Sequence, residues 1–213
     1  MNLNLGQWVV IGICALLLIA YIRGYFYNRQ QARRISNWLQ EGMRGWGRVV
    51  SAEGKLPGMA SGGRLEVTQA DPPLRNMEAV FILAPRENPL FYIFYTMQGK
   101  RDELVVWMTF HSAPKQSVEV ARPGDKQLES RLKEADKPAL KLVEAPAGLK
   151  MASEEKEEAL VEGKVRSFVQ SHPGTILRLA LRPSKPHLFL RANLRAVQSN
   201  PAEAFFKELS ELR

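Results

Sequence analysis

The side chains with the most catalytic potential are scattered along this chain. The three histidines, His111, His172 and His187, lie far apart, and none belongs to an H-x-x-x-H or H-E-x-x-H pair that would hold a metal. The chain has no G-x-S-x-G nucleophile motif and no Walker or dinucleotide-binding loop. The glycine-rich segment 58–63 lacks the Lys and Ser/Thr that hold nucleotide phosphates. We therefore expect no enzyme, cofactor, metal or small-molecule substrate, and a site assembled from distant residues is the alternative.

The more informative chemistry is cationic. No acidic residue occurs from Gly163 to Ala202, and alternating apolar and polar residues predict a hairpin of strands 176–182 and 187–193. One face of this hairpin and the residues around it would carry five basic side chains: Arg178, Arg182, Lys185, Arg191 and Arg195. Such a face suits contacts with the phosphates of RNA, or with a partner, that read no sequence. A solvated face without a partner is the other interpretation.

A second candidate surface is the apolar segment 90–97. Its β-propensity favours a strand, but Asn88 as a cap, Pro89 at the first helical position and Gly99 beyond the end predict a helix. A helix that is apolar all round is buried in a core or lies against a membrane or partner. The residues we single out as belonging to a core or partner-binding helix are Leu90, Phe91, Phe94 and Tyr95.

These surfaces must be positioned relative to an N-terminal segment of 22 residues without a charged side chain. From Leu5 to Ile22, a helix would extend roughly 27 Å, close to the thickness of a hydrocarbon core. Trp8 stands at one end and tyrosines at the other, as in an aromatic belt. A cleaved signal peptide is the alternative, but it needs a basic start and a small-residue cleavage site. The sequence therefore predicts a single membrane anchor.

The charges that follow this segment predict its orientation. Four arginines come directly after it and would meet lipid head groups at the membrane surface: Arg23, Arg29, Arg33 and Arg34. Because basic loops stay on the cytoplasmic side, we expect the N-terminus outside and the remaining chain in the cytoplasm. The membrane would be the plasma membrane of a prokaryote or the endoplasmic reticulum of a eukaryote. The one cysteine, Cys14, lies in the anchor, so no intrachain disulfide is expected.

The rest of the chain is long enough for one domain with its own core. The composition is 45% hydrophobic and 24% charged, and the net charge of +8 agrees with partners that carry phosphate groups. Predicted strands and helices do not alternate strictly, which indicates an α+β fold. Ser153 and Asn200 are expected to cap the last two helices. We expect an anchor over 1–28, a basic juxtamembrane helix over 29–45 that continues the span or lies in the interface, and a domain over 46–213.

The order of these elements resembles that of the calumin family, the coiled-coil membrane protein of the eukaryotic complex called protein associated with translocon. The similar stretches are Gly47-Arg48-Val49, the passage from Val80 through Asn88-Pro89-Leu90 to Leu104–Thr109, the segment 117–132, Gly148-Leu149, and Leu188-Phe189-Leu190 before the terminal helix. The resemblance covers most of residues 46–213 and rests on pattern and spacing.

The resemblance implies one N-out span, a cytosolic α+β domain and a role as an accessory in membrane-protein insertion beside the Sec channel. The implied partners are membrane lipids, Sec translocon components, other insertion factors and the ribosome. The chain differs from the family because no acidic segment precedes the span and no coiled coil follows the domain. Ribosome contact would therefore come from the folded domain. The alternative function is a membrane-tethered scaffold that binds an anionic lipid surface without a translocon role.

Overall fold

The computed structural model describes residues 4–52, 62–133, 140–154 and 160–213. These residues form one long helix and a domain built on a nine-stranded sheet in which every pair of neighbours is antiparallel, so the α+β prediction is confirmed. The helices are α1 (Leu5–Met43), α2 (Pro89–Met97), α3 (Lys126–Lys133), α4 (Leu160–Ser171), α5 (Leu194–Val197) and α6 (Ala202–Ser210), with 3-10 turns at Arg44–Trp46 and Pro146–Gly148.

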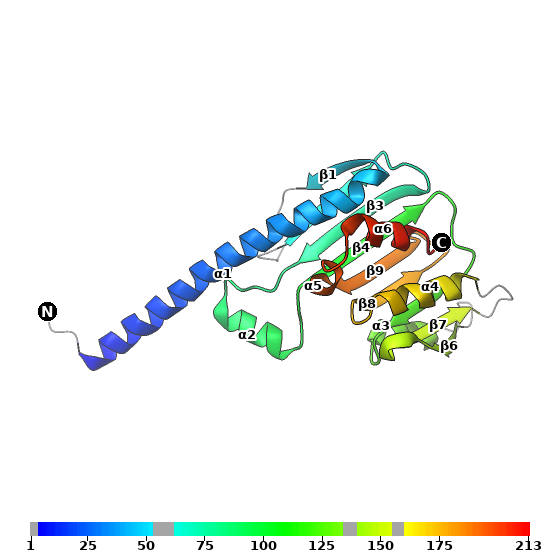
Figure 1. The fold of residues 1–213 in the computed structure, drawn as a ribbon. Helices are drawn as coiled ribbons and strands as arrows, with labels where there is room; N and C mark the ends of the chain where they lie inside the picture. Colours follow the sequence, from blue (N-terminus) through cyan, green and yellow to red (C-terminus); the bar gives the residue numbers. More distant parts are fainter. Residues whose placement is uncertain (1–3, 53–61, 134–139, 155–159) are drawn as a thin grey trace.

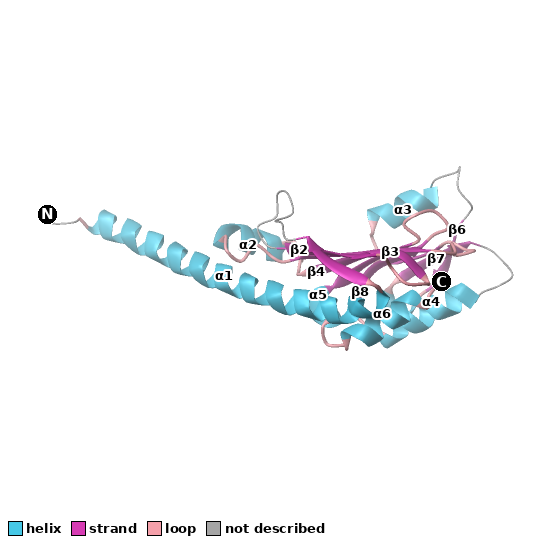
Figure 2. Cartoon of the chain, turned by 90° about the horizontal axis from the view of Figure 1, so that it is seen from above, coloured by secondary structure: helices cyan, strands magenta, loops and turns pink. Residues whose placement is uncertain are grey.

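The strands are β1 (Arg48–Ala52), β2 (Gly62–Thr68), β3 (Leu74–Ile82), β4 (Glu103–Phe110), β5 (Val118–Ala121), β6 (Leu140–Glu144), β7 (Lys150–Glu154), β8 (Ile176–Leu181) and β9 (Leu188–Asn193). Their order across the sheet is β1-β2-β3-β4-β9-β8-β5-β7-β6. Gly62 and Gly63 of the glycine-rich segment belong to β2, and residues 58–61 lie outside the described residues. Helices α1, α4 and α6 lie on one side of the sheet and α3 lies on the other, whereas α2 lies beyond the ends of β3 and β4 (Figures 1 and 2).

Helix α1 is one unbroken helix that belongs to two environments. Its N-terminal half extends away from the domain, and its C-terminal half lies against the sheet (Figure 1). The predicted juxtamembrane segment is thus a continuation of the span rather than a separate interfacial helix. Three of its side chains are part of the domain core, because Ile35, Leu39 and Met43 are at most 1% exposed. The core of the domain therefore includes residues of α1.

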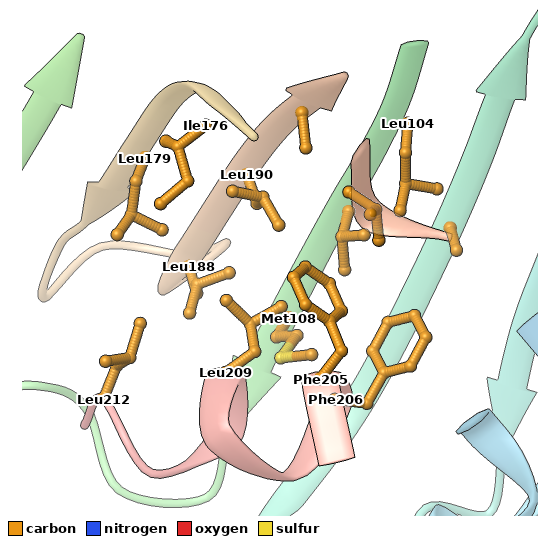
Figure 3. Close-up of a cluster of buried hydrophobic side chains, with 14 of the residues drawn as sticks. Leu104, Met108, Ile176, Leu179, Leu188, Leu190, Phe205, Phe206, Leu209 and Leu212 are labelled. Atoms are coloured by element: carbon orange, nitrogen blue, oxygen red, sulfur yellow. The ribbon is translucent and has the colours of Figure 1, made fainter. Parts of the chain in front are cut away.

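Helix α6 completes the core on the same side of the sheet. Figure 3 shows its apolar side chains pointing at β4, β8 and β9, where they meet Met108, Leu188 and other buried residues. Helices α1 and α6 approach each other closely at Gly42, where an added Cβ would lie 2.4 Å from the ring of Phe206. The ring nitrogen of Trp38 donates a hydrogen bond to the carbonyl of Asn200, which fixes the turn before α6.

Two predicted helix caps are wrong. We expected Asn200 to cap the terminal helix, but the cap position is Pro201, and the Asn200 amide instead donates to the carbonyls of Ala196 and Val197. We expected Ser153 to cap the preceding helix, but Ser153 lies in β7 and pairs with Val118. The next described residue of a helix is Leu160. In both cases the residue makes another contact in the fold, and its residue type alone does not predict that contact.

The predicted hairpin is confirmed as β8 and β9. Leu179 and Leu181 point into the core, as expected, but a bulge between Ile176 and Arg178 leaves Leu177 half-buried. Arg178 itself is only 5% exposed. The face that was expected to meet RNA therefore includes a buried arginine.

His187 links β4 to the turn before β9 and makes the fold sensitive to acid. Its Nδ1 accepts a hydrogen bond from the backbone N–H of Phe110 at 3.0 Å. Burial, together with the nearby charge of Lys185, lowers the pKa of His187 from 6.5. Because the unfolded chain then binds more protons than the native state, the stabilising contribution is present above about pH 6.5 and decreases as the pH falls.

We expect His187→Asn to reduce this acid sensitivity. The Asn oxygen can accept the same N–H bond but does not titrate, so the fall in melting temperature between about pH 7.5 and about pH 5 should be smaller than for the native chain. The smaller side chain should also lower the melting temperature at both pH values. Thermal unfolding of the full chain in detergent, followed by tryptophan fluorescence, gives both quantities. An unchanged pH dependence would show that other groups account for it.

Candidate membrane-contact site

The exposed half of α1 is long and apolar enough to cross a membrane. An 18-residue window in this helix has a mean hydropathy of 2.3, and none of the window is buried in the structure. The helix begins with a capping box, in which Asn4 accepts from the N–H of Gln7 and the Gln7 side chain accepts from the N–H of Asn4. These two bonds satisfy backbone N–H groups at the start of the helix, so the helix can begin here without a contact from the domain.

The four arginines expected at the membrane surface are all exposed on α1. Arg23, Arg29, Arg33 and Arg34 form no ion pair with a carboxylate in the described parts of the chain. Arg23 and Arg29 lie within about two turns of helix after the apolar segment, and Arg33 and Arg34 lie about one turn further along. An exposed guanidinium group close to the end of the span, as at Arg23, is suited to anionic head groups, and the cations further along α1 are attracted to a negatively charged membrane surface over about a Debye length.

A short loop from the sheet is fastened to α1 where the apolar segment ends. Gly24 lies so close to this loop that an added Cβ would be 1.9 Å from the carbonyl oxygen of Arg86. One turn further on, Asn28 is 3% exposed, and its amide donates to the carbonyl of Ala84 at 2.9 Å and to the carboxylate of Glu87 at 2.6 Å. The loop and the helix therefore move as one unit.

Arg86 extends this attachment into the sheet. Its guanidinium donates two parallel hydrogen bonds to Asp102, at 3.0 and 2.8 Å, and a third to the Asn28 side-chain oxygen at 3.1 Å. It also lies over the rings of Tyr27 and Tyr92, 5.0 and 5.6 Å from their centroids. Burial alone would lower the pKa of Arg86, but the hydrogen bond and charge of Asp102 outweigh it, so the pKa is raised and the guanidinium stays charged.

Helix α2 follows this loop directly, and it is not part of the core. Asn88 caps it by accepting from the N–H of Phe91, and Pro89 is the first helical residue, so the predicted helix is confirmed. The interpretation as a core helix is wrong, because no residue of α2 is buried. Five large apolar side chains are each more than half exposed: Leu90, Phe91, Ile93, Phe94 and Met97.

The exposed side chains of α2 are arranged as one face. Leu90, Phe94 and Met97 have the spacing of a single helix face, with the other two apolar residues on either side of it. The opposite face holds the tyrosines, and the hydroxyl of Tyr95 donates to the carbonyl of Arg101 at 3.1 Å. Transferring a large apolar side chain out of water contributes about 1.5–3 kcal/mol. Five such side chains together form an apolar patch of the kind that marks interaction surfaces in proteins.

The basic hairpin is not the free cationic face that the sequence predicted. Arg178 and Arg182 both bind the carboxylate of Glu119, which is 1% exposed, at N–O distances of 3.1 and 2.8 Å. Arg131 of α3 binds the same carboxylate at 3.1 Å. Arg191 is paired with Glu103 through two hydrogen bonds of 2.7 and 2.8 Å.

The other two of the five predicted basic residues are not part of these ion pairs. Lys185, in the β8–β9 turn, and Arg195, at the start of α5, are exposed and have no ion pair with a described carboxylate. They are also separated, because Lys185 lies at the end of the hairpin where Leu188 pairs with Met108, and Arg195 lies at the other end, beyond the Asn193–Glu103 pair. The structure thus divides the expected plate into three paired arginines and two isolated cations.

Sequence reasoning missed the residues that attach α2 to α1. Gly24, Asn28, Ile35, Leu39 and Gly42 share one side of the helix, and this spacing was visible in the sequence. A glycine and an asparagine in the first turns of that stripe indicate close approach of another segment and a buried polar contact. The contacting segment 84–88 carries no comparable signal of its own.

The structure also describes where the histidines lie. His111 is exposed, and His172 is buried with its Nδ1 3.0 Å from the carbonyl of Phe168. Over the described residues, no three His, Cys, Asp or Glu side chains are grouped as metal ligands. An open groove of about 1050 Å³ lies between α4 and the end of α6, lined by Lys164, Phe168, Glu208, Leu212 and their neighbours. None of the predicted membrane-surface, RNA-binding or partner-binding residues lines this groove.

Fold and site together define a class: an α+β domain on a long helix whose apolar half can span a membrane, with a second apolar helix beside it. Comparison with known proteins adds no narrower identity. The chain matches no family model, and no curated protein matches it.

Proposed function

We propose that this protein is a membrane-anchored, non-enzymatic accessory of membrane-protein insertion that works next to the Sec translocon. The observation that carries the proposal is α2, an apolar helix held in an exposed position against α1 at the end of the apolar segment. An accessory that receives apolar segments as they leave the channel needs such a surface beside its own anchor. The resemblance to the calumin family supports the same role.

The charge distribution supports the orientation that this role requires. The four free arginines of α1 follow the apolar segment, and the domain lies on their side of it. The N-terminus would then be outside and the domain cytosolic, where it meets ribosome-bound channels. The three paired arginines of the hairpin are occupied by Glu119 and Glu103, so a contact with ribosomal RNA is assigned to Lys185 and Arg195.

Recovery of partners from native membranes tests this function. The tagged full chain, solubilised in a mild detergent after crosslinking, should recover Sec-channel subunits or other insertion factors. Phe91→Gln together with Phe94→Gln should reduce this recovery several-fold, because the apolar face of α2 is interrupted. Val50→Gln is the matched control, since Val50 is 43% exposed on the edge strand β1, outside α2, and should leave recovery unchanged. Failure to recover any Sec or insertion component would refute the proposal.

A second candidate function, a tether that binds anionic lipid without a translocon role, is favoured by the free arginines of α1. It predicts that the chain in native membranes has no insertion partner and that its neighbouring lipids are enriched in anionic species. Arg29→Gln, Arg33→Gln and Arg34→Gln together should remove this enrichment. The lipid composition of particles extracted with their surrounding bilayer measures it, and the same preparation reports whether insertion factors are present.

A further inference from the structure

We infer that α2 lies in the head-group region of the same membrane that α1 spans, as a second and fixed point of contact between the domain and the bilayer. This inference rests on the anchor in the proposed function but not on a role in insertion. The depth of α2, its direction, its exposed face and the charges around it all fit this position.

The depth follows from the attachment to α1. Gly24 and Asn28 hold the loop that begins α2, and they come about two to six residues after Ile22, which is ~3–9 Å along the helix. The head-group layer on each side of a hydrocarbon core is about 5–7 Å thick. If the apolar segment of α1 fills the core, the start of α2 is placed within that layer. The loop cannot slide along α1, because Asn28 and Arg86 are bound to each other and to the sheet.

The direction of α2 fits this depth. Figure 1 shows α2 running crosswise to α1 and away from it, beside the middle of the long helix. A helix that crosses a spanning helix at the level of the head groups lies along the membrane surface. Gly99, with a φ of +70°, then turns the chain back towards β4. The helix is thus connected to the domain at both of its ends.

The side chains of α2 are divided as a surface helix requires. Leu90, Phe94 and Met97 face away from the domain, whereas Tyr92 and Tyr95 face it and contact Arg86 and Lys100, respectively. An amphipathic helix of this kind buries its apolar side chains at the boundary between head groups and acyl chains.

The charges at the ends of α2 are those that anionic head groups attract. Lys100 and Arg101 follow the helix and are exposed, and Arg23 projects from α1 near the same level. Exposed cations in this layer extend towards phosphate groups while the adjacent apolar side chains enter the acyl region. A lipid bilayer satisfies both parts of this surface at once.

Depth-dependent fluorescence of the full chain in lipid nanodiscs tests the inference. In a Cys14→Ser background, single cysteines replace Phe94 or Met97 in α2 and carry an NBD dye. Leu16→Cys in the exposed half of α1 is the bilayer reference. Lys185→Cys, at the opposite end of the sheet from α2, is the water reference. Nanodiscs made of phosphatidylcholine and phosphatidylglycerol, with and without doxyl-labelled lipid, contain no other protein.

We expect dyes at both α2 positions to be quenched by lipid with the doxyl group near the head of the acyl chain and to be protected from iodide several-fold relative to the dye at Lys185→Cys. Melting temperatures equal to that of the Cys14→Ser chain establish that the labelled chains are folded. Iodide access equal to that at Lys185→Cys, with quenching at Leu16→Cys retained, would overturn the inference and leave α2 as a surface for a protein.

The same measurement separates this inference from the proposed function. Loss of lipid quenching at Leu16→Cys as well would refute the membrane span, and with it both proposals. Lipid quenching at α2 combined with no recovered insertion factor would refute the insertion role and support the present inference.

Discussion

A chain shortened to begin at Arg44 is expected not to fold, whereas one that begins at Arg23 should unfold cooperatively. The reason is that Ile35, Leu39 and Met43 are core residues of the domain, although they belong to the helix that contains the candidate span. Deleting buried side chains of this size costs about 2–5 kcal/mol each, and a whole domain is stable by only about 5–15 kcal/mol. Their combined loss therefore reaches the total stability.

Point variants of the full chain test the same claim without removing the span. Leu39→Ala should lower the melting temperature by roughly 4–20 °C, as expected for about 2–5 kcal/mol in a domain of this size. Leu16→Ala is the matched control, since Leu16 lies in the same helix but is 69% exposed, and the domain should melt at the native temperature. A cooperative transition in the chain that starts at Arg44 would show that α1 is dispensable to the core. Near-ultraviolet circular dichroism in detergent distinguishes these outcomes.

Local signals in the sequence were sufficient for most of the elements. The helix at α2 was correctly predicted because Asn88, Pro89 and Gly99 mark its two ends, although the residues between them favour a strand. The hairpin of β8 and β9 was predicted from alternation, which depends on neighbours in sequence. The caps at Ser153 and Asn200 failed because each residue has another partner that a capping rule does not include.

What sequence reasoning could not provide is the pairing of distant segments. Arg178 and Glu119 are 59 residues apart, and they meet because β5 lies next to β8 across the sheet. Alternation places both side chains on a strand face, but it does not say which strands are neighbours. The same limitation applies to α2, since its composition is that of a core helix and only the packing of the loop at Gly24 leaves it outside.

Glu119→Gln is expected to be among the most destabilising single substitutions in this fold. The Gln side chain keeps the shape and one acceptor oxygen but removes the negative charge that Arg131, Arg178 and Arg182 share. Arg178 keeps Asp125 at 3.5 Å and a hydrogen bond to Gln127, and these groups do not replace a carboxylate that is 1% exposed. Removing one partner of a buried ion pair costs about 3–5 kcal/mol. The melting temperature should therefore fall by roughly 6–20 °C.

Glu103→Gln provides the matched control, because Glu103 also lies on a strand and binds an arginine through two hydrogen bonds. Its partner Arg191 is 46% exposed, so the loss should be at most about 1 kcal/mol. Equal effects of the two substitutions would mean that water reaches the Glu119 cluster. A large effect at Glu119 alone would indicate that the sheet depends on the pairing of Arg178 and Arg182 with this carboxylate. A loss of ribosome binding after a change at either arginine would then not identify an RNA contact. Lys185→Glu and Arg195→Glu test that contact while leaving the cluster intact.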